Sequence, residues 1–144
     1  MTTSTLTFSL GAKPRSSESA EPLQYFQGRI AFEEGRYAEA EQLFTSAGLD
    51  DKPGSYLRLA KDTKKITEGF QRAESEHFVF FYPKGKDEIL APYALETLES
   101  IRQALSEDLS FAPSEKVRVE VVNDARELSK VSTLTYKQII TTGT

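Results

Sequence analysis

The stretch from Glu21 to Ala47 constrains the fold of this chain more than any other. Its apolar residues recur at helical spacing in two sets, one on each side of Gly35. Glycine readily adopts the left-handed backbone with which many helices end. The pattern therefore predicts two helices joined by a tight turn. The apolar sets are Leu23, Phe26 and Ile30, followed by Tyr37, Ala40, Phe44 and Ala47.

Two small residues are expected at close contacts between the helices of this predicted hairpin. Gly28 allows the second helix to approach the first, and Ala40 lies where the hairpin closes. The spacing of Gly28, Gly35-x-Tyr37-x-x-Ala40, Phe44 and Ala47, with Pro53 near the end of a period of about 34 residues, resembles a tetratricopeptide repeat. An ordinary amphipathic hairpin is the alternative. In either case a single unit cannot bury its own faces, so another element must pack on it.

Composition excludes several classes of protein. The 144 residues are 38% hydrophobic and 28% charged, which is typical of a soluble globular chain. The net charge of −4, without a basic stripe, argues against nucleic-acid binding. There is no apolar run of about 18 residues and no basic region before the apolar N-terminal stretch, so neither a membrane span nor a signal peptide is expected, which favours the cytoplasm. Cysteine is absent, which rules out disulfides and thiolate metal sites.

Around the hairpin, two further segments are assigned. Residues 1–20 are interpreted as a mobile lead-in, in which Thr5 to Leu10 could pair as a strand. After a polar loop, Ser55 is a plausible N-cap for a third helix over Tyr56 to Ala73. We expect this helix to cover the open side of the hairpin. Its predicted apolar face consists of Tyr56, Leu59, Ala60, Ile66 and Phe70.

The periodicity then changes to that of strands. Ser75 to Tyr82 is dense in aromatic residues and predicts a strand that is buried on both faces. Asp87 to Leu109 predicts a long amphipathic helix, and Pro92 indicates that its first turn is irregular or that it starts late. Lys116 to Asn123 alternates valine with charged residues and predicts a second strand. A crossover helix between two strands predicts a parallel pair.

Two short helices are predicted after the second strand. Ala125 to Val131 is expected to be helical, with Asn123 or Asp124 as its cap, and Leu134 to Ile140 is a second candidate. The final residues to Thr144 are expected to be extended. The predicted fold is thus α+β: a repeat-like helical unit at residues 21–73, then a strand–helix–strand unit at residues 75–144.

The sequence offers very little catalytic chemistry. His77 is the only histidine, and without cysteine it cannot complete a zinc site of known spacing. Glycine-rich phosphate loops and a G-x-S-x-G motif are both absent. The remaining polar candidates are Glu33, Glu34, Glu39, Glu41, Asp50, Asp51, Tyr25, Tyr37 and Tyr56. Surface or packing roles explain these residues better, so no catalytic, cofactor-binding or metal-ligating residue is assigned.

The segment from Ser75 to Thr144 resembles the region that precedes the zinc motif in bacterial peptidase MA-like gluzincin metallopeptidases, which often carry tetratricopeptide repeats upstream. The resemblance depends on Ser75 to Tyr82, Leu90 to Glu96 and Val117 to Val122. It implies one side of a peptidase fold. The H-E-x-x-H helix of such families has no counterpart here, so no catalytic residue is carried over, and zinc is expected only in a longer parent protein.

These observations predict the non-catalytic N-terminal portion of a metallopeptidase-like protein, with the helical unit serving protein recognition. The alternatives are a free-standing adaptor that binds a protein or peptide and, more weakly, a small-ligand domain built on the sheet. The expected partner is a protein, a peptide or the missing catalytic part. Because two strands make a poor sheet, self-association through the sheet edge is also expected.

Overall fold

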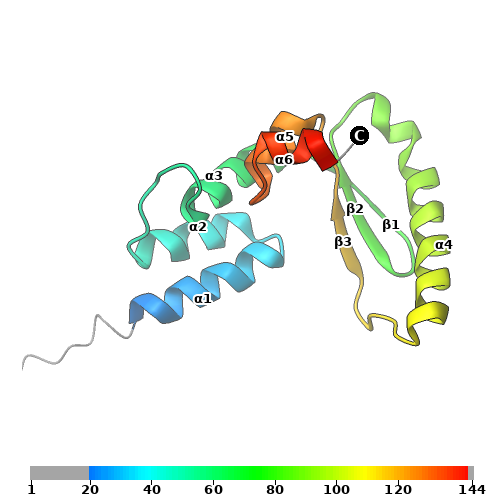
Figure 1. The fold of residues 1–144 in the computed structure, drawn as a ribbon, viewed down its shortest axis with the longest axis horizontal. Helices are drawn as coiled ribbons and strands as arrows, with labels where there is room; N and C mark the ends of the chain where they lie inside the picture. Colours follow the sequence, from blue (N-terminus) through cyan, green and yellow to red (C-terminus); the bar gives the residue numbers. More distant parts are fainter. Residues whose placement is uncertain (1–19, 143–144) are drawn as a thin grey trace, which may run out of the picture.

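The computed structural model describes residues 20–142, and it confirms the α+β class (Figure 1). The lead-in and the strand expected at Thr5 to Leu10 lie outside the described residues. A helical unit comes first and a three-stranded sheet follows, with two short helices at the end. The elements are α1 (Ala20–Glu33), α2 (Tyr37–Ser46), α3 (Tyr56–Thr67), β1 (Gln71–Glu74), β2 (Phe78–Tyr82), η1 (Lys86–Ile89), α4 (Ala91–Leu109), β3 (Val117–Glu120), α5 (Ala125–Val131) and α6 (Tyr136–Thr142).

The predicted hairpin forms, and glycine ends its first helix. Gly35 adopts φ +76°, and the N–H groups of Gly35 and Arg36 donate to the carbonyls of Phe32 and Ala31. This pair of bonds is a Schellman motif, which satisfies carbonyls that the helix end would otherwise leave unpaired. The chain therefore reverses within three residues, and α2 packs antiparallel to α1.

The two small residues act as predicted. A Cβ atom at Gly28 would lie 2.8 Å from the ring of Phe44, so α2 approaches α1 closely only because Gly28 has no side chain. Ala40 and Phe44 have no exposed surface. They form one core with Ala31, Leu57 and Ala60.

The packed face of α1 differs from the one that the apolar periodicity suggests. Tyr25, Gly28, Ala31 and Phe32 face α2 and α3, whereas the set Leu23, Phe26 and Ile30 lies on the solvent side. The helix is apolar on both faces, and the small residues decide which face packs because they allow the closer approach.

The third helix begins where it was predicted but ends early. The Ser55 hydroxyl accepts a hydrogen bond from the N–H of Arg58, which confirms the cap. The predicted end at Ala73 is wrong: α3 stops at Thr67, and Gly69 at φ +82° turns the chain into β1. Pairing of β1 with β2 outweighs the helical pattern of these residues. The buried face of α3 consists of Leu57, Ala60 and Thr63.

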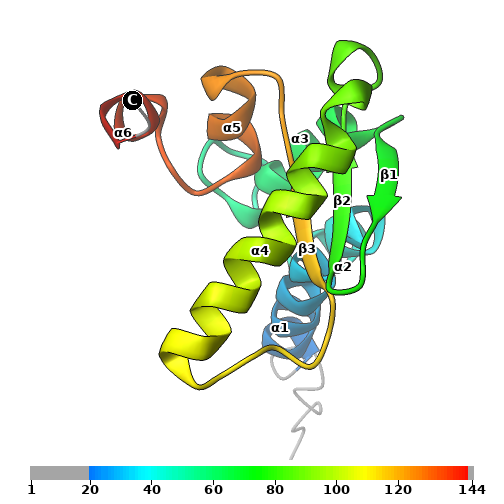
Figure 2. The ribbon, with the colours of Figure 1, turned by 90° about the vertical axis from the view of Figure 1, so that its right-hand side faces the viewer.

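The sheet has the order β1-β2-β3 (Figure 2). β1 and β2 form an antiparallel hairpin through Ser75 to His77, so the predicted strand is shorter than expected at its start. β2 and β3 are parallel, as predicted, with Phe78 opposite Val117 and Phe80 opposite Val119. A third strand, β1, thus completes a sheet for which the sequence pattern had indicated only two strands.

α4 covers one face of the sheet, and the helical unit lies on the other side (Figures 1 and 2). The irregular start predicted from Pro92 is confirmed, since the 3-10 turn η1 precedes α4 and proline occupies its first turn. Phe78 and Phe80 are buried against Ala91 and Leu95 of α4. The alternate side chains of β2 are only half-buried, so the expectation of complete burial on both faces is met on the α4 face alone.

The chain after β3 forms two helices. α5 has the predicted bounds, and Asp124 caps it by accepting hydrogen bonds from the N–H groups of Arg126 and Glu127. α6 continues to Thr142, so the extended end that was predicted is not found there. α5 packs against α3, which returns the end of the chain to the helical unit.

One polar contact joins the hairpin to the sheet. The hydroxyl of Tyr37 donates to the carboxylate of Glu120 at 2.8 Å, and Arg118 pairs with the same carboxylate at 2.7 Å. Burial and the bond to Glu120 raise the pKa of Tyr37. The Arg118 guanidinium lies 3.8 Å above the ring of Phe81. This contact holds the helical unit against the sheet face that α4 leaves uncovered.

Candidate protein-binding surface

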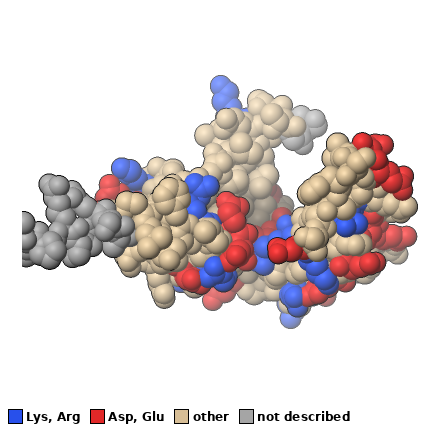
Figure 3. All heavy atoms as spheres, turned by 90° about the horizontal axis from the view of Figure 1, so that it is seen from below, with Lys and Arg blue, Asp and Glu red and all other residues tan. Residues whose placement is uncertain are grey.

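The outer face of α1 is the most exposed apolar stripe of the helical unit. Leu23, Phe26 and Ile30 are 59%, 63% and 56% exposed, although they belong to a helix whose opposite face is completely packed. Their spacing of three and four residues places them in a row along the helix. Seen from below, the surface where the chain enters α1 is mostly uncharged (Figure 3). Within the described residues no core includes this stripe, which makes it a candidate surface for a partner.

The charge around the stripe is acidic. Residues 20–46 contain five glutamates and two arginines and no other charged residue. Both arginines are engaged within the unit: Arg29 lies 4.2 Å above the ring of Tyr56, and Arg36 pairs with Glu34 and Glu39. Arg36 offsets part of the charge of Glu34 and Glu39, and the five glutamates against two arginines leave residues 20–46 with a net negative charge.

A second group of exposed apolar residues lies on α4. Ile101 and Leu105 are 50% and 51% exposed, in the half of the helix that follows the buried contact at Leu95. The apolar face expected of this amphipathic helix is therefore buried only in part. These residues lie on the element that covers the sheet, so they differ in setting from the row on α1.

The edge of the sheet at β3 is open among the described residues, because β3 pairs with β2 alone. The N–H groups of Val117 and Val121 donate into β2. Backbone groups alternate in direction along a strand, so those of Arg118 and Glu120 point to the outer side. Unpaired edges of this kind accept another strand.

His77 lies in a polar cluster with Ser75 and Glu99. The Glu99 carboxylate accepts bonds from the Ser75 hydroxyl at 2.5 Å, from the His77 backbone N–H at 2.8 Å and from its Nδ1 at 2.8 Å. These donors, the Ser75 hydroxyl foremost, lower the pKa of Glu99 to about 2. The ionised carboxylate fixes the hydrogen of His77 on Nδ1. The cluster ties α4 to the turn between β1 and β2.

This cluster supports structure better than catalysis. The Ser75 hydroxyl donates to Glu99 and not to His77, so histidine does not activate it as a base would. A groove of about 720 Å³ lies beside His77, open to solvent and lined mainly by charged and polar side chains. Among the described side chains, no three His, Asp or Glu residues are placed to hold a metal ion.

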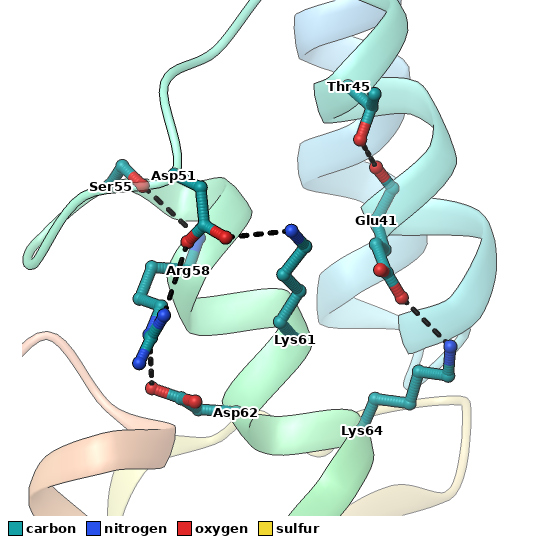
Figure 4. Close-up of polar contacts among 8 residues, drawn as sticks. All are labelled: Glu41, Thr45, Asp51, Ser55, Arg58, Lys61, Asp62 and Lys64. Carbon is teal, nitrogen blue, oxygen red and sulfur yellow. Dashed lines mark hydrogen bonds and ion pairs between the residues drawn. The ribbon is translucent and has the colours of Figure 1, made fainter.

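Most of the other polar residues considered from the sequence take part in ion pairs or packing, and Glu33 is exposed. Asp51 pairs with Lys61 and Arg58, and Arg58 also pairs with Asp62, so this network ties the loop before α3 to the helix (Figure 4). Glu41 of α2 pairs with Lys64 of α3 at 2.8 Å. Tyr25 and Tyr56 pack with Phe44.

Sequence reasoning missed two features of these surfaces. It did not distinguish the outer row of α1 from its packed face, although Gly28 and Ala31 on the opposite side are a usable signal. It also did not single out Glu99, whose role depends on the β1–β2 turn, and no local pattern marks that contact.

Within the described part of the chain, every helix is too short or too polar to cross a lipid bilayer. Comparison of the chain with family models, curated proteins and solved structures finds no match.

Proposed function

We propose that this chain is a non-catalytic protein-recognition module, and that it forms the N-terminal portion of a metallopeptidase-like protein. The observation that favours recognition is the row Leu23, Phe26 and Ile30 on the outside of α1. A row of this spacing on a helix is the surface that an amphipathic partner helix covers.

The helical unit is better suited to recognition than the rest of the molecule. Its core is closed, with Phe44, Ala40 and Ala60 fully buried, so an outer apolar row is not needed for its stability. The exposed row on α4 lies beside a sheet with an open edge, where further strands or helices of the same protein would pack. The two rows therefore suggest different partners.

The open β3 edge supports the second part of the proposal. The outward backbone groups of Arg118 and Glu120 would pair with another strand, and the catalytic part of a metallopeptidase-like protein would supply it. Zinc and its ligands would belong to that part. A coding sequence that continues past Thr144 into H-E-x-x-H would support this; a continuation without that motif would overturn it.

A free-standing adaptor is the second candidate. It would use the same α1 surface, but its sheet would be complete or would pair with a second copy. Light scattering and hydrogen exchange separate these cases. Protected Arg118 and Glu120 amides, in a monomer or in a dimer, would favour the adaptor, whereas rapid exchange of these two amides would favour a missing strand.

The recognition surface can be tested by selecting helical peptides from a displayed library on this chain. We expect the selected peptides to lose binding to a Phe26→Ser, Ile30→Ser variant. The matched control is Ile101→Ser, Leu105→Ser, which removes an equally exposed pair with the same spacing from α4. Both variants should keep the circular dichroism spectrum of the parent, because the residues changed are exposed.

The comparison of the two variants decides the proposal. Loss of binding in the α1 variant alone supports recognition by the helical unit. Loss in the α4 variant alone, or equal binding to both, contradicts it.

A further inference from the structure

We infer that the partner segment that covers the outer row of α1 is an amphipathic helix whose apolar stripe is flanked by lysine or arginine. This inference rests on the proposed function, and it adds the chemistry of the partner to it.

The geometry of the row favours a helix over an extended segment. Leu23, Phe26 and Ile30 recur every three to four residues, which matches the i, i+3, i+7 spacing of a facing helix. α1 has 14 residues, or about 21 Å of contact length, which is enough for about four turns of a partner. An extended peptide would instead require unpaired backbone groups, and these are satisfied within a helix.

The charges beside the row favour basic flanks. Ile30 is followed at the third position by Glu33, its neighbour on the helix surface, and Glu34 comes directly after the end of α1. Both glutamates are exposed. A helix with acidic flanks would meet like charge at this end of the row, whereas one with basic flanks would be attracted and oriented by it.

The two arginines of the unit offset only part of this acidic charge. Arg29 turns away from the row to lie over the ring of Tyr56. Arg36 is shared between Glu34 and Glu39, which leaves the carboxylates of residues 20–46 in excess. The acidic charge beside the row therefore follows from how α1 packs as well as from its composition.

The test uses two synthetic helical peptides of about 18 residues that share one leucine stripe. One peptide has lysine at every flanking position and the other has glutamate. Binding to the whole chain is measured by fluorescence anisotropy at low and high salt. We expect the lysine peptide to bind at least about tenfold more tightly, and the difference to shrink at high salt.

Two variants make the result specific. Glu33→Lys with Glu34→Lys should reverse the preference between the peptides, and Phe26→Ser should abolish binding of both. Equal binding of the two peptides that is lost in Phe26→Ser would overturn the charge inference and leave the proposed function standing. Binding that survives Phe26→Ser, or no binding of either peptide, would overturn the proposed function as well.

Discussion

The helical unit buries its core more completely than the sheet unit does. Around Phe44 the three helices enclose a core in which four residues have no exposed surface. Around Phe80 the core is thinner, since Phe78 and Phe80 each keep 7% exposure and one helix covers the sheet. The difference follows from their neighbours. Three helices can enclose a small core among themselves, whereas a sheet needs cover on both faces and partners at its edges.

The largest expected effect concerns Phe44. Phe44→Ala should destabilise the chain by about 3–5 kcal/mol, because it leaves a cavity in the core that neighbouring side chains cannot fill without giving up their own contacts. Phe26→Ala makes the same change on the outer face of the same helical hairpin and should cost about 0.5 kcal/mol or less. Urea titrations of both variants test this. Similar midpoints would show that Phe26 of α1 contributes as much to the core as Phe44 of α2 does.

Ala40 tests how closely the hairpin packs. Ala40→Leu should cost about 1–3 kcal/mol, because the fully buried methyl group leaves no room for three more carbon atoms. Ala38→Leu, two residues earlier on the exposed side of α2, is the control and should change stability by about 0.5 kcal/mol. A tolerated leucine at Ala40 would mean that α2 can shift away from α1.

Glu99 makes the stability of the sheet unit depend on pH. Folding lowers the pKa of Glu99 from its ordinary value of 4.5 to about 2. The ionised carboxylate therefore stabilises the fold above the unfolded pKa, and this contribution is lost as the pH falls toward 2. In thermal melts, Glu99→Gln should weaken the dependence of the midpoint on pH across this range, while Glu96→Gln should not. If the melting midpoint of Glu99→Gln depends on pH as that of the parent does, the cluster is not the source of the pH dependence.

Tyr37 links the two units. Tyr37→Phe removes the hydrogen bond to Glu120 and should lower stability by about 1 kcal/mol, because the partly buried carboxylate keeps Arg118 as a donor but loses the tyrosine hydroxyl. Tyr93→Phe, at an exposed position on α4, is the control. Hydrogen exchange should show that the amides of β3 and those at the start of α2 lose protection together. A loss confined to α2 would indicate that the two units open independently.

The smallest effect is expected at Lys64. Its ion pair with Glu41 is exposed to solvent, so Lys64→Ala should change stability by less than about 0.5 kcal/mol, and high salt should reduce even that. A urea titration at two salt concentrations measures both effects. A larger loss that persists in high salt would show that the α2–α3 contact depends on this pair and not on the apolar core.

Local signals predicted the elements best where one residue decides the outcome. Gly35 ends α1, Ser55 starts α3 and Asp124 starts α5, because each satisfies backbone groups at a helix end. The error at residues 68–73 arose because β1 exists only through its pairing with β2. That pairing depends on residues beyond the reach of a helical pattern.

The sequence alone determined the α+β class, the helical hairpin around Gly28 and Ala40, and the parallel pairing of β2 and β3. These follow from periodicity, caps and chain connectivity, all of which act over a few residues. Only the tertiary structure decided which face of α1 is buried, where Glu99 meets His77, and which backbone groups of β3 remain unpaired. Each of these depends on contacts between distant segments. The candidate binding surface belongs to this second group, because an apolar row becomes a surface only when the rest of the fold leaves it uncovered.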